Sequence, residues 1–247
     1  MKGPFFPARQ LLDGVPRIDS HGLHTLLTDG AGTFSEYIRR GRELGLEAVA
    51  FTEHASNQTS YDFEAYARSK AQLQEMAWPM RVYLAAEVKL AHTDGTIDLG
   101  PKRIALVDFI VGVLHSYPDG NGGFQNPKKW KEAGAGAMEV MEWDYQLSKA
   151  LIHNSAVDVW GHPAGVFAAN FGPYDKAKLR ELISEAAAAG RVIELNSAPR
   201  YQAVFPIIVE TCLELDCLVS IGSDAHHPDQ LGHVIGHLED YLKNRNA

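Results

Sequence analysis

The chain has 247 residues, of which 45% are hydrophobic, and a formal net charge of −8 at pH 7. This length suits one barrel-type α/β domain, so we expect a single domain over residues 1–247, with 1–17 as an N-terminal extension. The negative charge disfavours a long basic track for duplex nucleic acid. No window is apolar enough to span a membrane, and the N-terminal stretch lacks the apolar core of a signal peptide, which predicts a cytoplasmic protein.

Short apolar runs alternate with helical patterns along the chain. RIDSH predicts the first strand, and TFSEYIRRGRELGL a helix with a capping box at Thr33 and Glu36. AVAFT, a helical stretch over about 62–78, RVYLAAEVKL and VDFIVGV follow. The polar segment 116–127 predicts a loop at the barrel mouth, before a helical region that reaches about residue 153 with a break near Gly134 and Gly136. VDVWG, RVIEL and LVSIG then alternate with helices over about 174–189, over about 204–215 and after Pro228.

This alternation favours a mostly parallel sheet with helices outside it. Seven strands are one fewer than a TIM barrel has. The fold class expected is therefore α/β, a distorted seven-stranded (β/α) barrel.

Each of the seven runs ends in residues able to bind a metal ion or a phosphate. They are His21 and His24, then His54, Glu87, His115, His162, Asn196, and finally Asp224 with His226. In β/α barrels the carboxyl ends of the strands converge on one cavity, so these side chains are expected to share a site. Imidazole and carboxylate ligands without a thiolate suit zinc, manganese or iron.

Several motifs together carry a family resemblance. They are Asp19-Ser-His-Gly-Leu-His24-Thr-Leu-Leu-Thr-Asp29-Gly, Thr52-Glu-His54, Gly161-His-Pro and Gly222-Ser-Asp-Ala-His226. The chain from about Ile18 to Leu231 resembles the PHP (polymerase and histidinol phosphatase) family, and most of all its stand-alone bacterial phosphatases. The segment IELNSAPR is similar to the part of histidinol phosphatases that carries an arginine near the substrate phosphate, which here is Arg200.

The resemblance implies two or three divalent metal ions and a ligand set. The set comprises His21, His24, Asp29, His54, Glu87, His115, His162, Asp224 and His226. Two ions would share a bridging water, lower its pKa and generate the nucleophilic hydroxide. These two ions would be held largely by His21, His24, Glu87, His115 and Asp224. A third ion beside Arg200 would draw on Asp29, His54, His162 or His226, and Asp224 or a nearby histidine would protonate the leaving group.

Two positions depart from the family pattern. The family has Asp-x-His-x-His, whereas two residues separate His21 from His24, so a regular strand would point them to opposite faces. Either a bulge at Gly22 or Leu23 restores one face, which the flanking motif favours, or Gly22 replaces the first histidine. Glu53 stands where aspartate is common, and would either shift the neighbouring imidazole or face the surface.

The function expected is metal-dependent hydrolysis of a small phosphorylated metabolite, with histidinol phosphate one candidate. Two alternatives remain open. One is a phosphodiesterase or exonuclease on short single strands, since related domains proofread DNA. The other is a metal-binding module without turnover. Asn196 is expected either to join the site or to cap its strand.

Overall fold

Eight strands form one curled sheet in the computed structural model, which describes residues 3–119, 121 and 123–245. In spatial order the sheet runs β1 (Phe6–Pro7), β10 (Leu218–Gly222), β9 (Val192–Asn196), β8 (Val159–Trp160), β5 (Ile110–Val113), β4 (Arg81–Lys89), β3 (Ala48–His54) and β2 (Ile18–Leu23). Every pairing except that of β1 with β10 is parallel. The seven parallel strands are those predicted, and the α/β fold class is confirmed.

The curl brings the two outermost parallel strands, β2 and β10, together. The Ser20 hydroxyl donates to the carbonyl of Ile221 at 2.8 Å, and the amide of Asp224 donates to the carbonyl of His21 at 3.1 Å. These contacts stand in place of a regular ladder, since among the described strands β2 pairs only with β3 and β10 only with β9 and β1. The closure is therefore partial, and it lies beside the first and last metal-ligand motifs.

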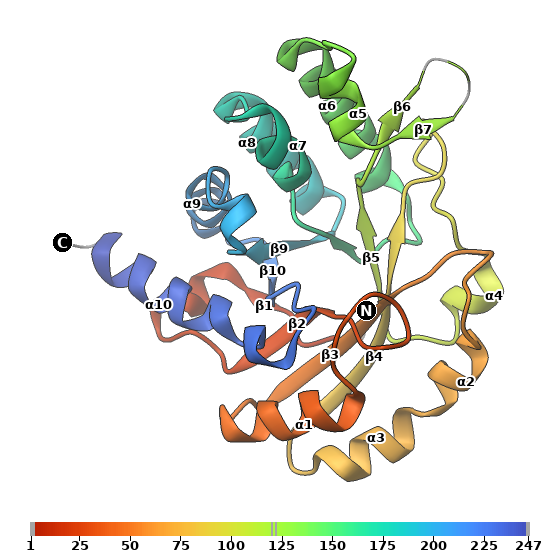
Figure 1. The fold of residues 1–247 in the computed structure, drawn as a ribbon. Helices are drawn as coiled ribbons and strands as arrows, with labels where there is room; N and C mark the ends of the chain where they lie inside the picture. Colours follow the sequence, from red (N-terminus) through yellow and green to blue (C-terminus); the bar gives the residue numbers. More distant parts are fainter. Residues whose placement is uncertain (1–2, 120, 122, 246–247) are drawn as a thin grey trace.

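Helices surround the outside of the sheet (Figure 1). They are α1 (Phe34–Glu43), α2 (Phe63–Arg68), α3 (Lys70–Ala77), α4 (Pro101–Ile104), α5 (Pro127–Glu132), α6 (Ala137–His153), α7 (Gly165–Phe171), α8 (Lys176–Ala188), α9 (Phe205–Leu215) and α10 (His233–Arg245). The capping box of Thr33 and Glu36 forms as predicted, and the break between α5 and α6 falls at Gly134 and Gly136. The short helices α4 and α7 were not predicted. Among the described residues, no helix combines the length and apolarity that crossing a membrane requires.

Two further short pairings were not predicted. Phe6 and Pro7, inside the stretch set apart as an N-terminal extension, pair antiparallel with Val219 and Leu218. Within the predicted loop 116–127, β6 (Tyr117–Pro118) and β7 (Phe124–Gln125) form a hairpin, so the loop prediction is wrong at those residues. Residues 120 and 122 of this segment lie outside the described part.

Side chains alternate between the two faces of each strand, and those that face inward form an apolar layer and a polar layer inside the barrel. On β3, β4, β5, β8 and β9 the inward face carries small or branched apolar residues, namely Ala50, Ala85, Val111, Val113, Val159 and Val192, which form one cluster with Phe109. Residues two and four positions further on share that face. These positions hold His54 on β3, Glu87 on β4, His115 just beyond β5 and Glu194 on β9. The apolar layer thus closes the bottom, and the polar residues collect at the carboxyl ends.

Candidate metal centre

A bulge in β2 brings both histidines of the first motif to the same side. Asp19 pairs with Val49 and Leu23 with Phe51, so four steps on β2 match two on β3. Gly22 absorbs the shift with a φ of +84°, and a Cβ there would lie 2.0 Å from the Cα of Asp224. The bulge alternative is confirmed, and Gly22 does not stand in for a histidine. Only glycine allows this approach of β2 to the loop after β10.

Glu87 lies at the centre of the site and uses its two oxygens in different directions. Oε2 lies 3.2 Å from Nε2 of His21, 3.0 Å from Nε2 of His24 and 3.7 Å from Nδ1 of His54. Oε1 lies 3.2 Å from Nε2 of His115 and 3.7 Å from Nε2 of His162. Burial alone would raise the pKa of Glu87, but the surrounding imidazoles hold it well below its usual value. The carboxylate is therefore charged and can bridge two cations.

Three overlapping groups of side chains have the spacing of metal ligands. They are His21, His24 and Glu87, then Glu87, His115 and His162, and finally His24, Asp29, His54 and His226. All predicted ligands except Asp224 belong to at least one group. His162 groups with His115 and Glu87, away from Asp29, His54 and His226. In the order given above, we call the three sets the buried group (His21, His24 and Glu87), the middle group (Glu87, His115 and His162) and the open group (His24, Asp29, His54 and His226).

His24 belongs to two groups through different ring nitrogens. Its Nε2 faces Glu87, and its Nδ1 lies 3.8 Å from Oδ1 of Asp29. A neutral imidazole carries a proton on one nitrogen, so His24 can ligate through only one of them at a time. The rest of the open group holds together without it, because Oδ2 of Asp29 lies 3.3 Å from Nε2 of His54 and 3.5 Å from Nε2 of His226.

Glu194 is the main residue of the site that sequence reasoning missed. It is fully buried on β9, its Oε1 lies 2.7 Å from Nδ1 of His21, and its other oxygen accepts the backbone amide of His162. Burial alone would lower the pKa of His21, but Glu194 and Glu87 raise it well above its usual value. A carboxylate behind a ligating histidine fixes the ring orientation. The available signal was a lone glutamate on the inward face of an apolar strand.

Asn196 and Glu53 act through hydrogen bonds. Asn196 is buried, donates to Oε1 of Glu194 at 3.0 Å and accepts the amide of Ala198 at 2.9 Å, so it both caps its strand and supports the site. Glu53 is also buried and does not face the surface. It accepts the amide of Thr25 at 3.0 Å and the hydroxyl of Thr28 at 2.6 Å, which fixes the chain just after His24.

Asp224 lies at the edge of the cluster and forms an ion pair with Arg200. One oxygen contacts the guanidinium, while Oδ1 lies 3.7 Å from Nε2 of His24. Burial and Glu87 would raise the pKa of Asp224, but His21, Arg200 and His162 hold it below its usual value. Asp224 has a φ of +52° and His162 one of +30°, an uncommon conformation for residues other than glycine that often accompanies functional sites.

The residues present fit divalent metal ions. His24 is fully buried, yet neither ring nitrogen makes a well-aligned hydrogen bond to any described residue. Leaving buried polar atoms without a partner costs about 1–3 kcal/mol each. The donors are imidazoles and carboxylates, and neither Cys212 nor Cys217 belongs to any of the three groups. This set suits zinc, manganese or iron.

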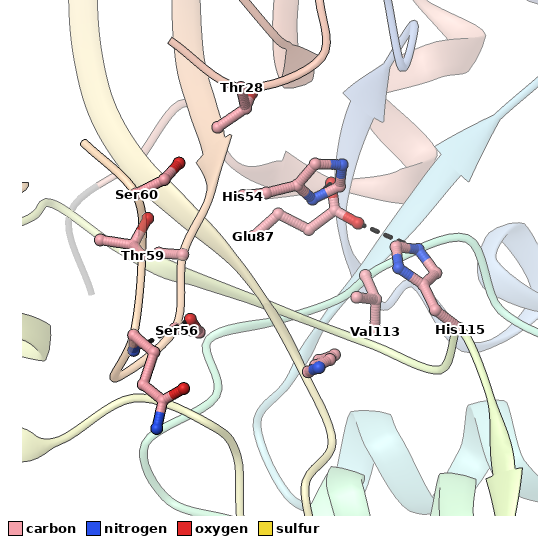
Figure 2. Close-up of a pocket in the computed structure, with 11 residues that line it drawn as sticks. Thr28, His54, Ser56, Thr59, Ser60, Glu87, Val113 and His115 are labelled. Atoms are coloured by element: carbon pink, nitrogen blue, oxygen red, sulfur yellow. Dashed lines mark hydrogen bonds and ion pairs between the residues drawn. The ribbon is translucent and has the colours of Figure 1, made fainter. Parts of the chain in front are cut away.

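Two cavities flank the cluster. One of about 420 Å³ is lined by His54, Glu87 and His115, with Thr28, Ala55, Ser56, Gln58, Thr59, Ser60, Lys89 and Val113. Figure 2 shows His54, Glu87 and His115 on one side of it, facing the hydroxyl side chains of Ser56, Thr59 and Ser60. The other, of about 620 Å³, is lined by Arg200, Asp224 and His226 and by residues from the 3-10 turn at 228–230.

The curled parallel sheet, the helices around it, and the imidazoles and carboxylates clustered at the strand ends are typical of a barrel-like α/β protein with a metal site. A PHP domain model matches residues 20–198, and the chain belongs to this family.

Curated relatives agree with that assignment, and solved structures share the fold. The chain is 24% identical over 221 residues to a probable phosphatase of Caldanaerobacter subterraneus, covering 85% of this chain and 76% of the relative. It is 28% identical over 237 residues to a probable histidinol-phosphatase of Deinococcus radiodurans, covering 87% and 88%. A structure from Listeria monocytogenes, named as the histidinol phosphatase HisK, superposes with a TM-score of 0.72 at 17% identity, covering 87% of this chain and 97% of that one. The HisK structure from Lactococcus lactis, complexed with zinc, L-histidinol and phosphate, gives 0.65 at 17%, covering 92% of each chain.

Proposed function

We propose that this protein is a metal-dependent phosphatase that hydrolyses small phosphomonoesters. The observation that carries the proposal is Glu87, a buried carboxylate whose two oxygens face two different sets of imidazoles. The probable phosphatases among its relatives support the same chemistry. A structural metal site would have its ligands closed around a single ion, whereas here His54 and His115 line an open cavity.

The three groups each have a place in this chemistry. Ions in the buried and middle groups would share Glu87, and an ion in the open group would be held by Asp29, His54 and His226. When bound, such ions lower the pKa of water and neutralise charge on phosphate oxygens.

The protein's own residues orient the reactants. Glu194 holds His21 and the backbone of His162 in place, and Glu53 fixes the chain around Thr25 and Thr28. Arg200 reaches the cluster from the larger cavity, where its guanidinium, now paired with Asp224, would bind a phosphate oxygen. Because its pKa is lowered, Asp224 stays ionised near neutrality, which suits a ligand better than a proton donor to the leaving group.

The test is release of inorganic phosphate from a panel of monoesters, with p-nitrophenyl phosphate as a general probe. The protein is assayed as purified, after chelation, and after adding back manganese or zinc. We expect turnover that chelation abolishes and metal restores. A diester and an oligonucleotide without a terminal phosphate serve as controls. Hydrolysis of these controls but of no monoester would replace the proposal with the phosphodiesterase alternative, and no turnover with metal bound would leave the non-catalytic module.

A further inference from the structure

The smaller cavity reaches at least one residue of each of the three groups. Its lining includes His54 from the open group, His115 from the middle group and Glu87, which the buried and middle groups share. The larger cavity includes His226 from the open group and Asp224, but neither Glu87 nor a residue of the middle group. A phosphomonoester bound at the cluster would therefore have the 420 Å³ cavity beside it for its leaving group.

Much of the wall of this cavity comes from one anchored loop that carries polar side chains. Ser56, Gln58, Thr59 and Ser60 come from the loop after β3. That loop is held from outside, because Arg103 donates to the carbonyl of Ser56 at 2.9 Å. Asn57 also accepts the amide of Gly100 at 2.9 Å. Hydroxyl and amide side chains on an anchored loop suit a leaving group that itself carries hydroxyls.

Lys89 gives the cavity its charge. It lies two residues beyond Glu87 on β4, so both side chains occupy the inward face, with Cα atoms roughly 7 Å apart. Lys89 is exposed, and its ammonium makes no ion pair with any described residue. Apart from Glu87, which the imidazoles surround, the lining contains no carboxylate, and it contains no aromatic ring besides the imidazoles of His54 and His115.

We propose that this cavity binds the leaving group of the substrate, and that Lys89 there binds a second anionic group. This rests on the proposed phosphatase function and narrows its substrate class to hydroxylated phosphomonoesters bearing a further negative charge. Histidinol, the alcohol in the Lactococcus lactis structure, carries an amine that is cationic near neutrality. In this cavity that cation would face Lys89 with no free carboxylate to pair with.

The experiment compares kcat/KM for matched esters. 3-Phosphoglycerate carries a carboxylate where glycerol 3-phosphate carries a hydroxymethyl group, and histidinol phosphate supplies the cationic case. We expect the order anionic, neutral, cationic. In Lys89→Gln the ratio of anionic to neutral kcat/KM should fall about fivefold, the effect of losing one partly exposed ion pair. In Lys89→Glu, where attraction becomes repulsion, it should fall about 25-fold.

Lys243→Glu, in the last turn of α10, makes the same charge change away from the cavity and should leave the ratio unchanged. A second readout does not depend on turnover. Titrating glycerate into the metal-loaded protein should shift the NMR signals of Lys89 and of the 56–60 loop, and glycerol should shift them less. Equal preference for all three esters, or a preference for the cationic one that Lys89→Glu leaves unaltered, would overturn the inference. Failure to hydrolyse even p-nitrophenyl phosphate would instead overturn the proposed function.

Discussion

The buried group and the open group hold similar ligand types in contrasting ways. The side chains of His21, His24 and Glu87 are at most 2% exposed, whereas that of Asp29 is 53% exposed and those of His54 and His226 about a third. Behind the buried ligands stand further hydrogen-bonding residues, above all Glu194. The contrast teaches that one part of the site is built into the barrel, while the other is formed at its rim, where a bound ion would be open to solvent and substrate.

The largest expected effect comes from Glu87, which belongs to both the buried and middle groups. Glu87→Gln keeps the shape but removes the charge that offsets the surrounding imidazoles and any cations. We expect kcat/KM to fall about 1000-fold or more, the several kcal/mol that metal-ion catalysis supplies. Steady-state kinetics with metal analysis by mass spectrometry would measure it. A variant that keeps both its metal content and its activity would show that Glu87 does not bridge.

A ligand of the open group should be easier to compensate. We expect His226→Ala to raise the half-saturating metal concentration roughly 100-fold. A direct ligand should cost at least the upper end of the 10–100-fold effect seen for residues that orient ligands. Excess metal should restore most of the activity, because the site at the rim remains accessible. The control is His21→Ala, which removes a ligand of the buried group alone, and excess metal should not restore its activity. Equal recovery of the two variants would remove the distinction between the groups.

A substitution of Glu194 tests how much the residues that hydrogen-bond to the buried group contribute to metal binding. Glu194→Gln keeps an acceptor for the amide of His162 but loses the charge beside His21. We expect a 10–100-fold loss of metal affinity in the buried group, with little change in the open group. Glu210→Gln, at a glutamate that pairs with Arg245 on the surface, is the matched control. Metal titrations monitored by calorimetry measure the affinity of each group separately. An equal loss of affinity in both groups would show that Glu194 does not act on the buried group alone.

The sequence predicted the part of this architecture that repeats. Continuous apolar runs ending in polar residues gave all seven parallel strands and brought the predicted ligands to one mouth, because parallel strands share the edge where they end. Strand-end position also predicted His115 and Asp224, which come from elements far apart in the chain.

The features that the sequence did not predict are very short strands and contacts between side chains from distant parts of the chain. Two-residue strands such as β1 and β6 have no periodicity to detect, since their pairing is set by the neighbouring backbone. In the sequence Glu194 is a lone glutamate within an apolar strand, and only the curl of the sheet places it behind His21. The ion pair between Arg200 and Asp224 likewise joins two strand ends whose distance the sequence does not give.

The smallest expected effect is a difference in proton release between the two groups. The pKa of His21 is raised well above its usual value, whereas burial and His24 lower the pKa of His54 despite the opposing effect of Glu87. Near neutrality the metal-free protein therefore holds a proton on His21 and none on His54.

A ligating imidazole must be neutral, so an ion entering the buried group expels that proton. Its affinity should fall by up to about tenfold when the pH drops from 7 to 6. The affinity of the open group should change less over this interval, because a lowered pKa leaves His54 neutral through most of it. Calorimetric titrations in buffers of different ionisation enthalpy count the protons released, and equal release from both groups would mean that Glu194 and Glu87 do not keep His21 protonated.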